Sequence, residues 1–545
     1  MLFYRIAHLS RSMRVQLMTS VDTRPETIPM AATEARSHLS LRLGVGLALV
    51  VVGAAALRVP NLAGHLPAIV QPDEPTVVAR GLSALGGQLA PPEWDWPPLA
   101  GYVYAAAVMV ARVFSPGLTE DVGGRYLLGR VLFLGVSLVA VALTGVLGAR
   151  LAGDPRWRVL TGVGAAAALA VSYTSVRLSR IAHPEHLQIA LMLGSALCAL
   201  SFDRSRRSWP LAAAGVLAGL AGATKYLGVT VGLVPLLAVL VWPGRAREKA
   251  AQAGVLCASA LVGFAGGTFG TVVSGAFLDG FAWQVRHQAG GHLGYEAAGS
   301  GWLFHLTQSL PGTWGWPLTL LGFAGLVAAL ARGTRAQRLV AVLTVTLVAL
   351  VGSSQVRFPH YTLIVQPLLA VLAFVAVTRV RWPGVRVAVT ALVALSVGSV
   401  ALDDVRLVRT DGAPSTRLLA DAAVAGLPGQ VWSEGYSLTS ASPEGGDRQV
   451  VAFGTTPAVL DCGCVAVVSS YQEERYRRRP DLYPAEIAVY DALRERGRMI
   501  AEIAPARPLS YRWDLLPAWG LADLPLTGPL GPLGPTITVL DLRAP

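Results

Sequence analysis

The chain has 545 residues, of which 53% are hydrophobic and only 14% are charged, and its mean hydropathy is +0.51. Soluble chains have about a quarter of their residues charged, so this composition excludes an ordinary soluble multidomain protein. The net charge of +12 does not indicate a nucleic-acid partner, because the arginines occur in short clusters between apolar runs and form no single basic patch.

The first 40 residues are polar, contain arginine and lack a small-residue cleavage site before the first apolar run. We therefore expect a cytoplasmic tail over residues 1–40 and an uncleaved first span over Leu41–Leu57. Apolar runs of about the 20 residues that a span requires recur as far as Ala401. The sequence predicts a polytopic α-helical membrane protein whose membrane domain covers residues 41–401, in the plasma membrane.

The first span leads into an external loop, residues 58–98, that contains four carboxylates. Asp73 or Glu74 would cap a helix that begins at the following proline. The apolar spacing predicts that this helix is amphipathic and lies in the membrane interface (Val78, Leu82 and Leu85). Capping is the ordinary explanation for one acid, but ionised groups beside a membrane are costly and tend to be functional. The adjacent pair, followed by Glu93 and Asp95, therefore favours an acidic functional site.

Arginine-bearing turns predict which connections face the cytoplasm, because positive charge is retained on that side. Between these turns lie pairs of apolar runs, so the turns share the inner side (150–158, 203–207, 245–249, 332–338 and 379–386). Of the two runs Leu99–Phe114 and Tyr126–Leu147, only one can cross if Arg150 is to lie inside. We expect the other run to be re-entrant or interfacial, and Leu99–Phe114 has only about 16 residues. In all, we expect 11 to 13 membrane segments.

One predicted external connection, "VRLSRIAHPEH", carries Arg180, His183 and Glu185 between two spans. Ordinary interfacial anchoring is one explanation for this group. Its mixture of acid, imidazole and guanidinium between two apolar segments is the alternative reason to consider it functional.

Lys225 interrupts apolar sequence, although only two of the 45 basic residues are lysines. A snorkelling interfacial lysine is the ordinary explanation, but this scarcity favours an anion-binding role. Arg357, His360 and Tyr361 in "SSQVRFPHYTL" lead into a later span, where a basic-aromatic anchor is the alternative. Arginine matches phosphate with a planar fork of donors and lysine acts as a point charge, so both could contact a phosphate.

Residues 402–545 differ in character, with more charge and frequent prolines. "CVAVVSS" and "TITVLDL" are typical of strands, and "PAEIAVYDALRERG" has helical periodicity between a proline and a glycine. We expect a small α/β domain outside the membrane. Cys462 and Cys464 could form a local disulfide there or remain free thiols, and the four cysteines have no zinc-site spacing.

Carboxylates and cations on external loops suit one chemistry in particular. If a lipid phosphate carries an activated group, cations stabilise the leaving phosphate, while a carboxylate deprotonates an attacking hydroxyl or amine. Such a site must lie at the membrane, because the isoprenoid tail of the donor cannot leave the bilayer.

The chain resembles the GT-C superfamily of glycosyltransferases, which use polyprenyl-phosphate sugars. Within that superfamily it is similar to the dolichyl-phosphate-mannose protein mannosyltransferase branch and its bacterial relatives. The resemblance covers most of the chain from Leu41 onward and rests on blocks in the same order: "PDEP", "WPPLAGYVYA", "SRIAHPEHLQIALML", "GLAGATKYLGVTVG", "RFPHYTLIVQP" and, in the tail, "VVSSYQEERY" and "GPTITVLDL".

This resemblance implies an inverting transfer of one sugar from a polyprenyl-phosphate donor to an envelope acceptor, which could be protein, lipid or polysaccharide. By position, Asp73 is the expected general base with Glu74 beside it, and Lys225 the expected donor-phosphate contact. A second phosphate contact is expected at three residues of one connection (Arg357, His360 and Tyr361).

The resemblance also places Glu185 at the second acidic position, where a divalent metal shared with Asp73 is left open. Auxiliary or acceptor-binding roles fall to the remaining polar residues (Arg180, His183, Glu93 and Asp95). The sugar, the acceptor and the oligomeric state are not implied.

Two other classes of protein remain as alternatives. A secondary transporter predicts charges at mid-membrane and an inverted internal repeat, whereas here the charges fall at segment ends. A non-catalytic membrane scaffold with an external binding domain predicts that replacing Asp73 with Asn leaves its function intact.

Overall fold

The computed structural model describes residues 30–71, 73–91, 93–296, 299–439, 448–450, 457–506 and 524–543. The chain divides into a compact unit at residues 1–45 and a second at residues 46–545. Helix α2 (Met30–Arg58) begins in the first unit and ends in the second. Of the expected tail, residues 1–29 lie outside the described residues, and residues 30–40 belong to α2.

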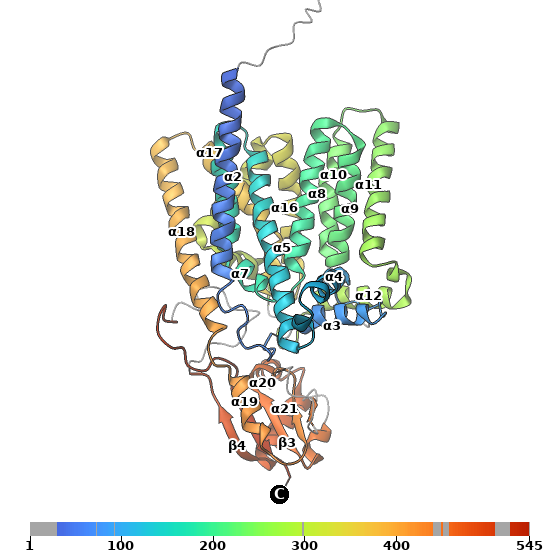
Figure 1. Ribbon diagram of the computed structural model, residues 1–545, viewed down its shortest axis with the longest axis vertical. Helices are drawn as coiled ribbons and strands as arrows, with labels where there is room; N and C mark the ends of the chain where they lie inside the picture. Colours follow the sequence, from blue (N-terminus) through green and yellow to red (C-terminus); the bar gives the residue numbers. More distant parts are fainter. Residues whose placement is uncertain are drawn as a thin grey trace, which may run out of the picture. The chain divides into compact units, whose positions relative to one another are not determined.

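The second unit is dominated by apolar helices that run side by side, as α8, α9 and α11 show (Figure 1). Their bounds, in chain order, are α3 Glu74–Leu85, α4 Leu99–Phe114, α5 Val122–Leu151, α6 Arg158–Ala170, α7 Tyr173–Ser179, α8 Glu185–Ser205, α9 Ser208–Thr224, α10 Leu233–Leu240, α11 Ala246–Gly267, α12 Gly275–Gly290, α13 Gly301–Phe304, α14 Leu310–Trp314, α15 Trp316–Arg332, α16 Arg335–Ser353, α17 Gln366–Arg379 and α18 Pro383–Thr410.

Among the described residues, six helices are long and apolar enough to cross a membrane, judged by length and composition. Two bent helix pairs raise this number to eight, and four shorter apolar helices join them. The bends are 61° between α6 and α7 and 119° before α15. The predicted polytopic helical fold is confirmed, whereas the expected number of 11 to 13 membrane segments stays a prediction.

Helices α3 and α4 form a pair beside the start of α5 (Figure 1). Gly81 allows their close approach, because a Cβ there would collide with the ring of Tyr104 and lie 2.7 Å from the carbonyl oxygen of Gly101. The amphipathic helix expected after the acid pair is therefore present as α3. At about 1.5 Å per residue, the 16 residues of α4 are too short to cross a core of about 30 Å, so we interpret α4 as the re-entrant or interfacial segment.

Helices α9 and α11 pack through glycines on both partners. A Cβ on Gly219 would collide with the carbonyl oxygen of Ala260, and one on Gly263 would collide with that of Val216. Small residues that bring backbones together in this way drive helix association in lipid, where burial of apolar surface provides no net force. The end of α9 carries Lys225, so this packing helps to place it.

We predict that Gly219→Leu destabilises the protein, because overpacking a tight contact costs about 1–3 kcal/mol. The measurement is thermal unfolding of the purified protein in detergent. Gly254→Leu on α11 is the matched control, since a Cβ at Gly254 has no neighbour within 4 Å. Equal melting temperatures for the two variants would contradict the packing described here.

In its described part, the C-terminal region contains a five-stranded sheet with the order β2-β1-β3-β5-β4. Strand β1 pairs in parallel with β2 on one side and β3 on the other, and β5 runs antiparallel to both β3 and β4. The predicted strands and helix are confirmed as β3, β5 and α21. The bounds are α19 Thr416–Ala425, β1 Val431–Ser433, β2 Arg448–Val450, β3 Val465–Ser469, α20 Ser470–Arg477, α21 Pro484–Arg496, β4 Arg498–Ile503 and β5 Ile537–Asp541.

Strand β3 is buried on both faces of the sheet, which explains its continuous apolar sequence. Ala466 and Val468 pack in a cluster with residues of α20 and α21, whereas Val465 and Val467 pack with residues of α19. The sheet therefore separates two small cores, one beneath each set of helices.

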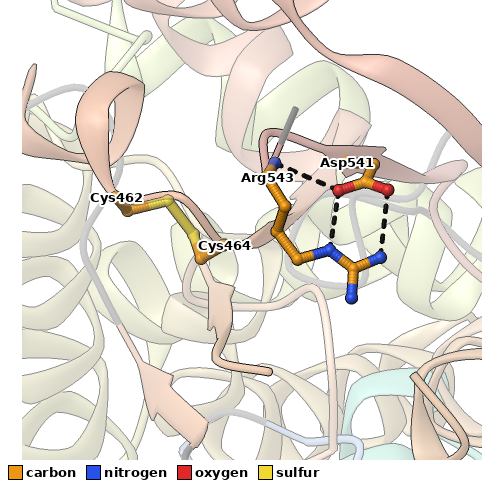
Figure 2. The surroundings of a disulfide bond; sticks show 4 residues. All are labelled: Cys462, Cys464, Asp541 and Arg543. Carbon is orange, nitrogen blue, oxygen red and sulfur yellow. Dashed lines mark hydrogen bonds and ion pairs between the residues drawn. A yellow bond between two sulfur atoms is a disulfide. The ribbon is translucent and has the colours of Figure 1, made fainter. Parts of the chain in front are cut away.

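Cys462 and Cys464 form a disulfide in the turn before β3 (Figure 2). Sequence alone left a bridge and free thiols open, and the structure contains the bridge. Nearby, Arg543 donates to Asp541 with Nε at 2.8 Å and Nη2 at 3.0 Å, which holds the pKa of Asp541 below its usual range. The amide of Leu542 donates to the carbonyl of Cys464 at 2.9 Å, so the bridged turn and the end of β5 are joined.

Candidate active site

Asp73 immediately precedes α3 but does not cap it. Its side chain makes no capping hydrogen bond to the helix and is 45% exposed. Instead, its Oδ2 lies 3.8 Å from Nε2 of His183, which is fully buried. The ordinary explanation for Asp73, helix capping, therefore does not apply, and the carboxylate is both accessible and aimed at an imidazole.

A row of charged groups continues from Asp73 into the membrane domain. Nδ1 of His183 contacts the carboxylate of Glu185, and Nζ of Lys225 contacts the same carboxylate from the other side. Glu185 begins α8 and Lys225 directly follows the last residue of α9. Helix N-termini favour anions and C-termini favour cations, so each helix end supports the charge it carries.

Protonation follows from this arrangement. Burial raises the pKa of Asp73, but the nearby imidazole of His183 and the charge of Lys225 outweigh it, so the net pKa falls below its usual value. For His183, burial lowers the pKa, but Glu185 and Asp73 raise it above its usual value. Both shifts favour the ionised form of Asp73 and the protonated form of His183.

The row opens onto a cavity of about 580 Å³. Glu185, Lys225, Trp96, His360 and Tyr361 lie in its wall, and Nζ of Lys225 lies 4.8 Å from the ring centroid of Trp96 and 5.9 Å from that of Tyr361. The remaining wall is mostly apolar and comes from the 3₁₀ helix Tyr226–Gly232, α12 and α16. The cavity therefore has a cation near aromatic rings at one end and an apolar wall at the other. Such a cavity suits an amphiphile with an anionic head.

The apolar wall continues onto the outside of the molecule. Val229 and Val285 both line the cavity, yet they are 50% and 53% exposed. Half-exposed apolar residues on a membrane protein suit contact with lipid, so we interpret this part of the wall as the side of the cavity that faces the hydrocarbon.

Other residues predicted from the sequence lie near this site without belonging to it equally. His360 and Tyr361 are in the cavity wall, and the His360 ring lies 6.0 Å from that of His183. Arg357 is not in the wall, and its guanidinium lies 5.9 Å from the ring of Phe304. The structure thus brings together His360 and Tyr361 with Lys225 and leaves Arg357 outside the cavity.

The two later acids of the first loop have different surroundings. Asp95 lines the cavity and forms an ion pair with Arg80. Nη2 of Arg80 also donates to the carbonyl of Glu93 at 3.1 Å, while the Glu93 side chain takes no part in that bond. Asp95 is therefore close enough to meet a ligand, whereas Glu93 contributes its main chain.

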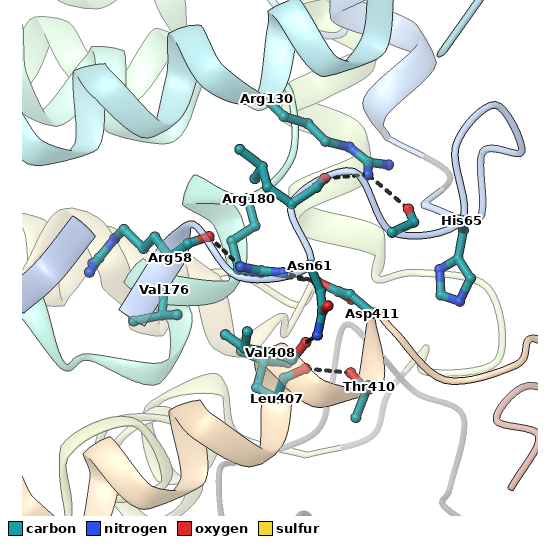
Figure 3. Close-up of polar contacts among 12 residues, drawn as sticks. Arg58, Asn61, His65, Arg130, Val176, Arg180, Leu407, Val408, Thr410 and Asp411 are labelled. Carbon is teal, nitrogen blue, oxygen red and sulfur yellow. Dashed lines mark hydrogen bonds and ion pairs between the residues drawn. The ribbon is translucent and has the colours of Figure 1, made fainter. Parts of the chain in front are cut away.

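Arg180 has a structural environment. It is 3% exposed, and its guanidinium donates to the carbonyl of Arg58 and pairs with Asp411 at 2.8 Å (Figure 3). These contacts join the end of α2 to the segment after α18 and keep Arg180 out of the cavity wall.

Glu74 is fully buried and, like Asp73 and His183, does not line the cavity. Nε and Nη2 of Arg130 donate to its two oxygens at 2.8 and 2.9 Å, and the amide of Ala182 donates at 3.3 Å. Both oxygens are therefore occupied. We interpret Glu74, which the sequence places beside the expected base, as a residue that fixes α3 to α5.

Sequence reasoning missed Trp96 and Arg130. Trp96 supplies a ring beneath Lys225, and the signal for it is the aromatic-acidic stretch "EWDWPP". Arg130 lies inside a long apolar run, so its charge was itself a signal that a buried acid must exist to pair with it.

A divalent metal shared by Asp73 and Glu185 is not supported by the geometry. Within the described ranges, no group of three His, Cys, Asp or Glu side chains is arranged to hold a metal ion. The imidazole of His183 lies between the two carboxylates, with one ring nitrogen toward each. These residues therefore do not fit a bridging metal, and we assign the positive charge between the acids to His183.

Residues 94–262 match the family model of the dolichyl-phosphate-mannose-protein mannosyltransferases. This segment contains Trp96, His183, Glu185 and Lys225 and ends before His360. No curated protein is similar enough to the chain to count as a relative.

Solved structures agree in fold over almost the whole chain. ArnT from Cupriavidus metallidurans bound to undecaprenyl phosphate has a TM-score of 0.52 and 14% identity, covering 94% of this chain and 100% of that one. The Archaeoglobus fulgidus oligosaccharyltransferase in its apo form has a TM-score of 0.52 and 13% identity, covering 84% of this chain and 73% of that one. The resemblance to the GT-C superfamily is thereby confirmed at the level of the fold.

A yeast protein is also similar over a shorter stretch. The S. cerevisiae protein O-mannosyltransferase Pmt1-Pmt2 complex bound to the sugar donor matches with 19% identity over 45% of this chain and 35% of that one. Its TM-score of 0.32 is too low to support a conclusion.

We predict that Glu74→Gln destabilises the protein by about 3–5 kcal/mol, because it leaves Arg130 buried without a counter-charge. Chemical or thermal unfolding in detergent measures the loss. Asp154→Asn is the matched control, since its pair with Arg156 has side chains 47% and 72% exposed and such pairs contribute about 0–1 kcal/mol. A Glu74→Gln protein with unchanged stability but no activity would instead show that Glu74 takes part in the chemistry.

Proposed function

We propose that this protein transfers a single sugar from a polyprenyl-phosphate donor to an acceptor of the cell envelope, with inversion, at the external face of the plasma membrane. One observation carries the proposal: the row Asp73, His183, Glu185 and Lys225 ends in a cavity with a cationic, aromatic end and an apolar, half-exposed wall. The GT-C fold and the match to the mannosyltransferase family model support it, as does a neighbour of the same fold that binds undecaprenyl phosphate.

Lys225 would meet the donor phosphate. Its ammonium group lies in the cavity wall between two aromatic rings, where water is partly excluded and a charge interaction is stronger than in bulk solvent. As the bond from the sugar to the phosphate oxygen breaks, the electron pair and negative charge go to the phosphate. A cation that is already in place stabilises that charge without reorganisation.

Asp73 would accept the acceptor's proton. Its carboxylate is accessible, and His183 and Lys225 keep it ionised. The attacking hydroxyl or amine forms a bond to the anomeric carbon, its proton moves to Asp73, and polyprenyl phosphate leaves from the opposite face. Attack opposite the leaving group produces inversion.

His183 holds the two carboxylates in fixed relation. Its two ring nitrogens face Asp73 and Glu185, so one imidazolium orients the proposed base and the partner of Lys225 together. The site therefore has two acids and two cations, so its own charges cancel before the anionic donor phosphate enters.

The decisive experiment uses the full chain in lipid nanodiscs with radiolabelled short-chain polyprenyl-phosphate sugars and an envelope extract. We expect transfer by the wild type, a loss of about 100–10,000-fold in Asp73→Asn, and a loss of about 100–1,000-fold in Lys225→Ala. The same assay with and without EDTA determines whether a divalent ion contributes.

Matched controls separate these losses from general damage. Asp154→Asn removes an exposed acid at a predicted cytoplasmic turn, and Lys249→Ala removes the second lysine, which contacts the carbonyl of Leu240. Both should keep wild-type transfer. No transfer with any lipid donor, together with ion-driven solute uptake by vesicles containing the protein, would show that it is a transporter instead.

We also predict that His183→Gln moves the acid limb of the kcat/KM profile to higher pH. A base with a lowered pKa stays ionised at lower pH, and the imidazole of His183 is the main group that lowers the pKa of Asp73. Without this imidazole the pKa rises, so activity is lost earlier as the pH falls. An acid limb that stays where it is in the wild type would mean that a group other than Asp73 limits the rate.

A further inference from the structure

The route of the chain to Asp73 has no helix or strand of its own. Residues 59–71 consist of turns, bends and irregular backbone between α2 and α3. A base must be held to within a fraction of an ångström, and a displacement of about 1 Å can cost roughly 100-fold in rate. Side chains from distant parts of the sequence must therefore fix this segment.

The first part of the segment is held by the membrane domain. Nη1 of Arg130 donates to the carbonyls of Leu62 at 2.8 Å and Gly64 at 3.0 Å (Figure 3). Arg130 also pairs with Glu74. This one side chain of α5 therefore binds the chain both before and after Asp73.

The second set of contacts comes from the end of α18 and the link to the C-terminal domain. The amide of Asn61 donates to the carbonyl of Val408 at 3.1 Å, as Figure 3 shows, and a ring nitrogen of His65 lies 2.7 Å from the carbonyl of Ala413. The loop is thus fastened to the start of the external domain as well as to the membrane helices.

Arg417 makes a contact closer along the chain to Asp73. It lies in the first turn of α19, is 4% exposed, and its guanidinium donates to the carbonyl of Val70, three residues before Asp73. The ring centroid of Tyr436 lies 6.0 Å from the guanidinium carbon of Arg417. Arg417 belongs to the C-terminal domain, so that domain reaches the segment that carries the proposed base.

The same domain touches the other side of the site. Arg475 of α20 contacts a ring nitrogen of His292 at 3.0 Å, and Arg478, directly after α20, donates to the hydroxyl of Tyr295. These partners lie in the segment that follows α12, and α12 forms part of the cavity wall. The domain therefore contacts both the segment that carries Asp73 and the end of a helix that lines the cavity.

We infer that Arg417 is a positioning residue for Asp73, and that the C-terminal domain acts in the reaction through it. The inference rests on the proposed function for its kinetic consequence. The contact between Arg417 and the carbonyl of Val70 fixes the position of the backbone three residues before Asp73. It therefore helps to fix the position of Asp73 at the start of α3. Without the contact, donor binding at Lys225 is unaffected, but the base no longer meets the acceptor at the right distance.

The test compares Arg417→Ala with the wild type in nanodiscs by two readouts. The first is hydrogen–deuterium exchange, in which we expect faster exchange in peptides covering residues 66–73 and unchanged exchange in α8 and α9. The second is steady-state transfer, in which we expect kcat to fall by about 10–100-fold while KM for the lipid donor stays within twofold. Arg417→Lys, which keeps the charge but not the planar fork, should lie between the two.

Arg494→Ala is the matched control, because Arg494 pairs with Glu473 inside the same domain and should leave both readouts at wild-type levels. If Arg417→Ala does not fold, Arg417→Lys decides by the same two readouts. Wild-type exchange over residues 66–73 in a folded Arg417 variant would overturn the inference. A higher KM for the lipid donor with an unchanged kcat would also overturn it. If the wild type transfers no sugar, the proposed function fails, while the exchange readout still determines whether Arg417 holds the segment.

Discussion

The buried pair between Arg130 and Glu74 is the interaction on which the rest of the site depends. One guanidinium on α5 neutralises the acid that begins α3 and also binds two carbonyls of the loop before it. Asp73 lies between these two attachments, so its backbone is held on both sides. Removing either partner leaves an uncompensated charge inside the protein, which is why the pair fixes geometry more effectively than an exposed ion pair can.

The charged row follows the same physical rule at smaller scale. Each of its groups is tolerated in a buried place because the next group compensates it: Lys225 balances Glu185, and His183 is shared by Glu185 and Asp73. Only Asp73, at the outer end, has much of its side chain exposed. The row thus leads from the accessible carboxylate of Asp73 to the ammonium group of Lys225, which lies in a cavity with an apolar wall.

Much of the fold could be predicted, because apolar run length and arginine placement determine helical spans almost without reference to tertiary structure. The strands β3 and β5 and the helix α21 were also predictable, since their periodicity and flanking residues are local. The polar site was predictable in part: Lys225 stood out by the scarcity of lysine, and Asp73 by its place beside a span. The sequence could not distinguish Glu74 and Arg357 from the residues of the site. Only the fold shows that Arg130 binds both oxygens of Glu74 and that Arg357 lies beside Phe304. Asp73 and Glu74 are adjacent in sequence, yet the side chain of Asp73 is accessible and that of Glu74 is fully buried.

The half-exposed valines of the cavity wall have a consequence for how this protein is to be studied. A donor that enters past Val229 and Val285 arrives by lateral diffusion in the bilayer and never passes through water. Its relevant concentration is then a mole fraction among the surrounding lipids, not an amount per volume of buffer. Diluting the membranes with buffer should leave the rate per protein unchanged, whereas diluting the donor with inert phospholipid at constant volume should slow it.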